Sequence, residues 1–188
     1  YLAYRKAIQE AVSAQLSAWG EAREQEDKAR RRAARPLVRD LEAVMQRDRK
    51  EADDARRQLA DMIKIGKACG LTVGGGLQCV FGCRFEGAID PDAVIDMIKE
   101  QLDLGIDEIA LADSAGMANP VSIQEISGKV MELAEDKPVF LHLHDTEGKG
   151  LANALAALQI GIVHFDTAFG GTGGCPFIKG ASGNISTE

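Results

Sequence analysis

The chain has 188 residues, a length that suits one domain of ordinary size or a piece of a larger protein. Its 45% hydrophobic and 27% charged residues are typical of a globular protein in water, and no apolar run is long enough to span a bilayer. The formal net charge of -7 argues against polyanionic partners, so neither nucleic acid nor an anionic membrane surface is expected to bind.

The four cysteines lack the spacing of a zinc finger, and the motif CVFGC, formed by Cys79 and Cys83, is weak as a redox motif. Reduced thiols and a cytoplasmic location are therefore expected. The first residues, YLAYRKAIQE, do not resemble a signal peptide, and a chain that starts with Tyr1 is expected to be an excerpt or a processed product.

Residues 1–50 are predicted to form a charged helical segment, and the helical pattern continues to residue 68. Acids and bases recur three or four residues apart, a spacing that supports an exposed helix, and Pro36 is expected to break or kink it. Because neighbouring acids balance the basic run ARRRAAR, a solvated helix face is favoured over a nucleic-acid patch. Residues 51–188 are predicted to form a second region of different character.

In that second region, helices and strands alternate. Asp90–Pro91 and Asn119–Pro120 each combine an N-cap with a proline in the first turn, and glycines such as Gly70 mark helix ends. The predicted order is a helix ending at Gly70, a strand over 71–81, a helix over 91–104, a strand over 106–113, a helix over 120–134, a strand over 138–144, a helix over 151–160 and a strand over 162–169.

A strand–helix repeat of roughly thirty residues indicates right-handed βαβ units in a parallel sheet. With about four strands visible, the predicted fold is α/β: a partial, or half, TIM-type (β/α) barrel preceded by the charged helical segment. Polar side chains gather at the carboxyl ends of the predicted strands, where such folds place their chemistry: Asp113, His142, His144, Asp145 and Asp166.

The stretch VFLHLHDTEGKG places His142 and His144 two residues apart on one strand, so their side chains project from the same face. They could hold a divalent cation or be two hydrogen-bonded interior histidines, and the spacing leaves both hypotheses open. Oxygen donors as further ligands would favour Mg²⁺ or Mn²⁺ over structural zinc. The third histidine, His164, shares a strand face with Asp166, and a satisfied interior pair is favoured there.

The segment GGTGGCPFIKGASGN, residues 170–184, is rich in glycines that indicate backbone conformations which residues with a Cβ resist. It is neither a P-loop nor a dinucleotide-binding loop, because GK[ST] and GxGxxG are lacking. Cys175 could approach a substrate or be a buried small hydrophobe, while Asn184 could offer its carbonyl oxygen to a cation or cap a turn.

Four motifs resemble, in order and approximate spacing, those of the hydroxymethylglutaryl-CoA lyase family of metal-dependent TIM-barrel lyases: FGCRFEG, ALADSAGMANP, LHLHDTEGKGLANALAALQIGI and GGTGGCPFIKGASGNISTE. The resemblance covers residues 51–188. By matching motif, it implies that His142, His144 and Asn184 bind a divalent cation, Mg²⁺ or Mn²⁺, and that Cys175 and Asp113 are catalytic.

The resemblance further implies a retro-Claisen cleavage of a 3-hydroxy-3-methylglutaryl-type CoA thioester into acetyl-CoA and acetoacetate, a reaction of leucine catabolism. Metal coordination would acidify the tertiary hydroxyl of this acyl-CoA substrate. Asp113 or a neighbouring histidine would take the hydroxyl proton, and Cys175 would protonate the acetyl-CoA enolate.

The sequence also departs from the family pattern. The family's first strand carries an Arg-Asp pair that completes the metal site, and no such strand is found in this sequence. Arg84 stands where the family has proline and Glu147 where it has an aromatic residue, which bears on acyl-group specificity. The isolated chain is therefore expected to be inactive unless a homo-oligomer or another chain completes the barrel.

Two other hypotheses remain. The first is a non-catalytic half-barrel that mediates assembly, which the missing Arg-Asp strand favours. The second is a synthase or carboxylase relative that acts on another acyl thioester or on a 2-oxo acid.

Overall fold

The structure is a computed structural model that describes residue 47, residues 49–175 and residues 182–188. The chain divides into two compact units between Asp61 and Met62. Most of the predicted charged segment, residues 1–46 and residue 48, lies outside the described residues, and a domain boundary after residue 50 stays a prediction. Within the described part of the chain, no helix is long and apolar enough to cross a membrane.

The described part of the first unit, residue 47 and residues 49–61, is helical and carries ion pairs along its own surface. Arg56 lies 3.4 Å from Asp53, and Arg57 contacts Asp54, both at a spacing of three residues. Such exposed pairs add little to stability, but they agree with the predicted solvent-exposed helix in which acids and bases lie three or four residues apart.

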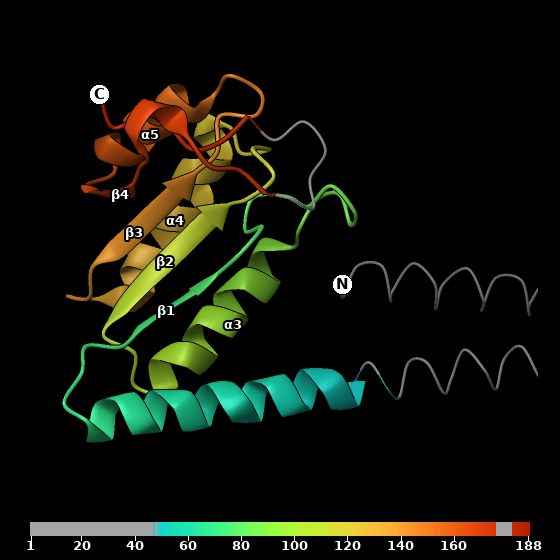
Figure 1. Ribbon diagram of the computed structural model, residues 1–188, viewed down its shortest axis with the longest axis vertical. Helices are drawn as coiled ribbons and strands as arrows, with labels where there is room; N and C mark the ends of the chain where they lie inside the picture. Colours follow the sequence, from blue (N-terminus) through green and yellow to red (C-terminus); the bar gives the residue numbers. More distant parts are fainter. Residues whose placement is uncertain (1–46, 48, 176–181) are drawn as a thin grey trace, which may run out of the picture. The chain divides into compact units, whose positions relative to one another are not determined.

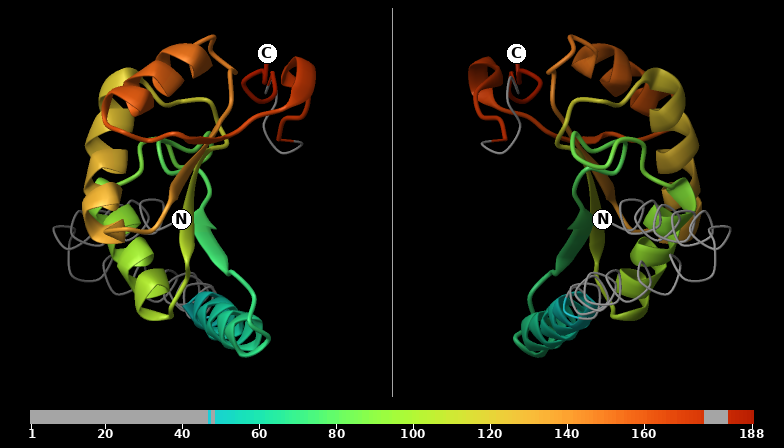
Figure 2. Two further views of the ribbon diagram at one scale, coloured as in Figure 1. Left: turned by 90° about the vertical axis from the view of Figure 1, so that its left-hand side faces the viewer. Right: turned by 90° about the vertical axis from the view of Figure 1, so that its right-hand side faces the viewer.

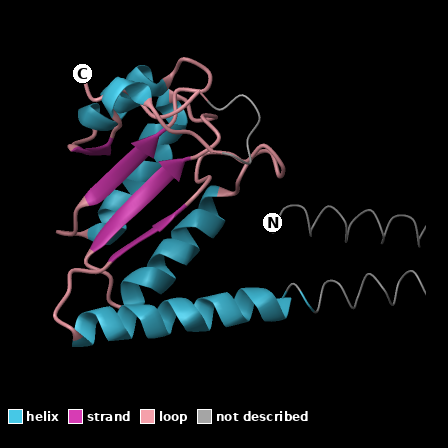
Figure 3. Cartoon of the chain, in the orientation of Figure 1, coloured by secondary structure: helices cyan, strands magenta, loops and turns pink. Residues whose placement is uncertain are grey.

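The second unit contains a four-stranded parallel sheet with three helices between its strands (Figures 1 and 3). The sheet has the order β1-β2-β3-β4, so each strand pairs with the next along the chain. Its elements are β1 (Gly74–Leu77), α3 (Pro91–Asp103), β2 (Glu108–Asp113), α4 (Pro120–Ala134), β3 (Val139–Leu143), α5 (Gly150–Gln159) and β4 (His164–Asp166), followed by the short 3-10 helix η1 (Phe169–Gly171). The predicted parallel α/β arrangement is confirmed, although β1 and β4 are shorter than predicted.

Helices α3 and α4 begin where the sequence predicts. The Asp90 side chain accepts a hydrogen bond from the Asp92 backbone N–H at 3.0 Å, and a proline follows the cap. Asn119 accepts hydrogen bonds from the backbone N–H groups of Val121 and Ser122, at 3.0 and 3.1 Å. The Ser122 hydroxyl accepts in return from the Asn119 N–H, which closes a capping box.

The two faces of the sheet have different roles. Figure 2 shows α3, α4 and α5 on one side of the strands. Side chains on that side are fully buried: Ile109, Leu111, Leu141 and Leu143. On the other face, the parallel register places residues of neighbouring strands side by side in two rows. One row contains Ala110, Phe140 and His164; the other, which we call the polar row, contains Ala112, His142 and Asp166. The polar row lies nearer the carboxyl ends of the strands.

The glycine run of β1 is explained by close packing on two sides. A Cβ on Gly76 would lie 2.3 Å from the Ala110 carbonyl oxygen, and one on Gly75 would lie 2.5 Å from the side-chain oxygen of Gln101. Gln101, which is buried on α3, accepts a hydrogen bond from the Gly76 N–H at 2.8 Å and donates to the Gly76 carbonyl at 3.3 Å. Its amide therefore continues the sheet's hydrogen bonding at β1.

This packing predicts opposite effects for two glycine-to-alanine substitutions. Gly76→Ala forces its Cβ against backbone and is expected to lower the free energy of unfolding by about 1–3 kcal/mol. Gly128→Ala, in the middle of α4 with nothing within 4 Å of the added Cβ, is expected to raise it by about 0.5–1 kcal/mol. Urea unfolding followed by circular dichroism measures both, and equal effects of the two substitutions would contradict the packing of β1.

Candidate metal and acyl-CoA site

The histidine pair meets at the end of β3. The Nε2 atoms of His142 and His144 are 3.1 Å apart, and the two ring centroids are separated by 5.1 Å. His142 is the next-to-last residue of β3, and His144 follows the strand. The two Nε2 atoms face each other within hydrogen-bond distance, and the tautomers of the rings decide which of them donates.

Asn184, which lies forty residues away in sequence, pairs with His144 across an isolated antiparallel bridge. The Ile185 N–H donates to the Leu143 carbonyl at 3.0 Å, and the Asp145 N–H donates to the Gly183 carbonyl at 2.9 Å. The structure therefore brings Asn184 to the end of β3, where His142 and His144 lie; that the three bind a cation stays a prediction.

The side chain of Asn184 is oriented so that its oxygen is free. Its Nδ2 donates to the Thr172 carbonyl at 2.9 Å, while its Oδ1 is buried without a hydrogen-bond partner. A Cβ on Gly173 would lie 2.7 Å from Nδ2, so glycine makes room for this orientation. A buried, unpartnered carbonyl oxygen is costly unless something binds it, and this atom suits a cation.

The donor set fits a divalent cation. Two ligand atoms at about 2.1 Å from one ion and at a right angle to each other lie about 3 Å apart, close to the separation of the two Nε2 atoms. Two nitrogens and an amide oxygen leave the site open for further oxygen ligands. Among the described residues, no three His, Cys, Asp or Glu side chains gather, so an acidic ligand is not part of this set.

His144 is held in the form that binds cations. It is buried, and this burial lowers the pKa of its imidazole; the neighbouring His142 lowers it further, while the backbone of Ser114 acts in the opposite direction. Its Nδ1 forms no hydrogen bond of normal geometry. A neutral imidazole keeps one nitrogen lone pair available, which a metal ligand requires.

Asp113, at the end of β2, is fully buried. Its two carboxylate oxygens accept hydrogen bonds from the backbone N–H groups of Met117 and Ala118, at 2.9 and 3.1 Å. Burial raises the pKa of this carboxyl, although the two hydrogen bonds oppose the shift. The residue therefore shapes the loop after β2, and its raised pKa makes it a better proton acceptor than an exposed aspartate.

Cys175 is half-buried and is the last described residue before the gap at 176–181. The pKa of the Cys79 thiol is raised first by burial and then by Cys83, while a hydrogen bond with Ser114 opposes the shift; Cys175 raises it further. Of these causes the effect of Cys175 is the smallest, so the position of its thiol relative to the loop after β1 stays a prediction.

Sequence reasoning missed an ion-pair network across two loops of the site. Glu147, in the loop after β3, lies 2.9 Å from Arg84 in the loop after β1 and 2.9 Å from Lys149. Hydrogen bonds from Lys149 and Arg84 lower the pKa of the Glu147 carboxyl. The sequence holds a signal for this contact. Arg84 and Glu147 are two positions at which the sequence departs from the family pattern, and they carry opposite charges.

His164 and Asp166 are not the interior pair that the sequence predicts. His164 is exposed and stacks on Phe140, with ring centroids 4.8 Å apart. Asp166 instead faces His142, with 3.7 Å between its Oδ2 and the histidine Nδ1. The prediction is wrong because the parallel register, rather than proximity along the chain, selects the neighbour of Asp166.

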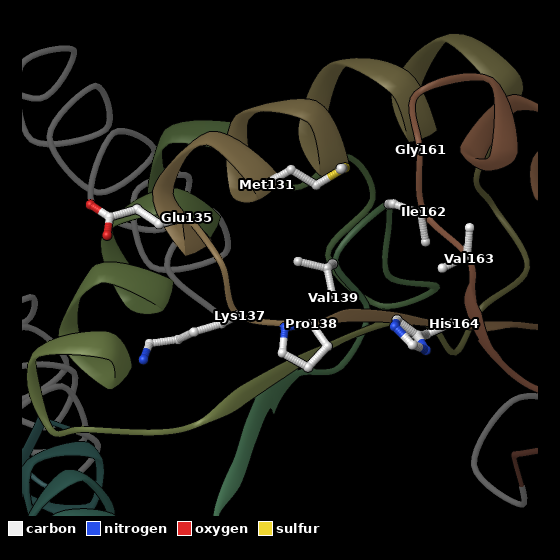
Figure 4. Close-up of a pocket in the computed structure, with 9 residues that line it drawn as sticks. All are labelled: Met131, Glu135, Lys137, Pro138, Val139, Gly161, Ile162, Val163 and His164. Carbon is white, nitrogen blue, oxygen red and sulfur yellow. The ribbon is translucent and has the colours of Figure 1, made fainter.

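A pocket lies at the opposite end of β3, where the strand begins (Figure 4). Its volume is about 160 Å³, smaller than the pockets that hold drug-sized ligands. The pocket is lined by Met131, Glu135, Lys137, Pro138, Val139, Gly161, Ile162, Val163 and His164. It is therefore separate from the histidine pair and too small for an acyl-CoA.

Comparisons with known proteins agree on one family. A family model described as HMGL-like matches residues 3–188. The mitochondrial hydroxymethylglutaryl-CoA lyase of Bos taurus is 37% identical over 136 residues, which cover 72% of this chain and 42% of that protein. The (R)-citramalyl-CoA lyase of Chloroflexus aurantiacus is 44% identical over 119 residues, which cover 63% of this chain and 38% of that protein.

A solved structure gives the same picture. An HMG-CoA lyase from Acinetobacter baumannii, in complex with coenzyme A and 3-methylmalate, superposes with a TM-score of 0.65 and 43% identity. The match covers 68% of this chain and 42% of that one. The chain thus spans less than half the length of these relatives.

The burial of Asp113 predicts a specific pH dependence of stability. Because the folded state holds the Asp113 proton more tightly than the unfolded state, its stabilising contribution is complete below the ordinary aspartate pKa of about 3.9 and is lost as pH rises through the raised pKa. The free energy of unfolding of the wild type, minus that of Asp113→Asn, should therefore fall as the pH rises above about 4, by at most about 1.4 kcal/mol per pH unit.

Urea titrations at several pH values measure this difference, and the exposed Asp103→Asn controls for the loss of one carboxylate. A difference between wild type and Asp113→Asn that rises with pH would contradict the burial effect.

Proposed function

The chain belongs to the HMGL-like family, and we propose that it forms the cation-binding part of an active site that cleaves a 3-hydroxyacyl-CoA thioester by a retro-Claisen reaction. The family resemblance predicted from the sequence is thereby confirmed. The relatives named above are CoA-thioester lyases, and they lend no support to a non-catalytic assembly protein. Since the chain spans less than half of their length, the activity of the whole protein is part of the proposal.

One observation carries this proposal: the Nε2 atoms of His142 and His144 lie 3.1 Å apart, and His144 pairs through its backbone with Asn184, whose Oδ1 is buried without a hydrogen-bond partner. We assign His142, His144 and Asn184 as ligands of a divalent cation, Mg²⁺ or Mn²⁺. When bound, such a cation polarises the oxygens of the substrate and makes its hydroxyl more acidic. An acidic ligand, expected in the family on a strand with an Arg-Asp pair, would come from a segment or a partner outside the described residues.

Two further side chains are proposed to move protons. Asp113 would accept the proton of the substrate hydroxyl as the carbon–carbon bond breaks and the hydroxyl carbon becomes a carbonyl. The bonding electrons pass to the acetyl-CoA fragment as an enolate, and Cys175 would donate its thiol proton to that carbon. A cysteine suits this step because its ordinary pKa, about 8.5, lies closer to neutrality than that of a serine hydroxyl.

The acyl group is either of two related kinds. A 3-hydroxy-3-methylglutaryl thioester would give acetoacetate, whereas a citramalyl thioester has its carboxylate on the hydroxyl carbon and would give pyruvate. Identity does not separate the two candidates, because the chain is 44% identical to the citramalyl-CoA lyase and 43% identical to the HMG-CoA lyase of Acinetobacter baumannii. Arg84 and Glu147, joined across the loops, are proposed to affect this choice.

The location and the assembly also remain proposals. The relatives include both mitochondrial and cytoplasmic enzymes, so a cytoplasmic location rests on the sequence-based expectation alone. We propose that the chain acts in a homo-oligomer or beside another chain segment that completes the barrel wall.

Removing either histidine of the pair should abolish cation retention. After exhaustive dialysis, the wild type is expected to keep about one divalent ion per chain, while His142→Ala and His144→Ala lose it because each deletes a ligand. His164→Ala is the matched control, since it removes the third histidine from an exposed position on the same sheet. Metal analysis by plasma mass spectrometry decides the question, and retention by all three variants would refute the assigned ligands.

Cys175→Ser should lower turnover while leaving cation binding unchanged. Loss of the proton donor is expected to reduce kcat by about 10²- to 10⁴-fold, the range typical of general acid–base catalysis. The assay follows acetyl-CoA release from both thioesters and identifies acetoacetate or pyruvate as the second product. The exposed Cys69→Ser should keep wild-type kcat, and an unchanged kcat in Cys175→Ser would remove the thiol from the mechanism.

A further inference from the structure

The second ring nitrogen of His142 faces a carboxylate. Strands β3 and β4 pair in parallel with His142 opposite Asp166, so both side chains leave the sheet on the face away from the helices. The Nδ1 of His142 lies 3.7 Å from the Oδ2 of Asp166. Among the described residues, Asp166 forms no ion pair with a lysine or an arginine, and the imidazole of His142 is the group that its carboxylate faces.

The identity of the protonated nitrogen decides what His142 can do. A neutral imidazole carries one proton, and the other nitrogen keeps a lone pair. A carboxylate beside Nδ1 attracts the proton to Nδ1, which leaves the lone pair on Nε2. In His142, Nε2 is the atom that lies 3.1 Å from the Nε2 of His144.

The 3.7 Å between the Asp166 Oδ2 and the His142 Nδ1 is within the range of an ion pair, but it exceeds the usual hydrogen-bond range of about 2.7–3.2 Å. The carboxylate therefore acts on the ring through its field, and rotation of either side chain can shorten the contact. The side chains are 32% and 54% exposed, which leaves room for that rotation but also screens the pair. An effect on proton placement is thus expected, with little effect on fold stability.

We propose that Asp166 is a positioning residue for His142: its carboxylate holds the proton on Nδ1, so that Nε2 presents its lone pair to the cation. The inference deepens the proposed function, because it rests on the cation site assigned to His142, His144 and Asn184. Sequence proximity alone would have paired Asp166 with His164.

The first readout is the tautomer of His142 in the cation-free protein. Long-range ¹H–¹⁵N spectra distinguish the two nitrogens of each imidazole, and the chain has only three histidines, so the signals are assignable with single variants. At a pH where the rings are neutral, the wild type should show His142 with its proton on Nδ1. Asp166→Asn should shift this population toward Nε2–H, and Asp166→Glu should restore it.

The second readout is Mn²⁺ affinity by isothermal titration. Asp166→Asn is expected to weaken binding by about 10- to 100-fold, the usual effect of losing a carboxylate that orients a ligand. Asp166→Glu should recover most of the affinity. Asp136→Asn, which removes one exposed carboxylate near the start of β3, should stay within about twofold of the wild type if charge alone is not the cause.

The outcomes separate this inference from the proposed function. If the wild type binds no Mn²⁺, the proposed cation site fails, and the inference fails with it. If the wild type binds and Asp166→Asn binds equally well with an unchanged His142 tautomer, the cation site stands and the positioning role is overturned. Equal weakening by Asp166→Asn and Asp136→Asn would also overturn it, because the effect would then be one of net charge.

Discussion

The candidate site depends on one backbone pairing, between the end of β3 and the segment around Asn184. This antiparallel bridge sets the Asn184 amide beside His144 and joins the last described residues to the sheet. Gly183 permits it, because a Cβ there would lie 2.3 Å from the Gly171 carbonyl oxygen and because its φ is 108°. Without the pairing, Asn184 would not be held beside His144, and the proposed cation site would lose its amide oxygen.

The ionisable groups around this site have pKa shifts that depend on whether they are buried or exposed. Burial lowers the pKa of His144 and raises that of Asp113, so in both cases it favours the neutral form. On the surrounding loops, Glu147 has its pKa lowered by its partners Lys149 and Arg84 and is favoured as a carboxylate. The buried groups are thus favoured in their neutral forms, while the exposed loops carry fixed charges.

Most of the helices and strands were predictable because their signals are local. The caps at Asp90 and Asn119, each followed by proline, mark helix starts through hydrogen bonds made within three residues. Strand ends were less predictable, and the strand expected over 162–169 is only His164–Asp166. A strand extends only as far as its neighbour supplies hydrogen bonds, and that neighbour lies far away in the sequence.

The sequence by itself determined the alternation of helices and strands, the family, and the shared face of His142 and His144, because a strand's side chains alternate with a period of two. Only the tertiary structure decided that their Nε2 atoms meet beside Asn184 and that Asp166 faces His142 rather than His164. These contacts join residues of separate segments, so they follow from the register between strands and the path of the loops. The spacing of residues along a single strand or helix determines neither the strand register nor the path of the loops.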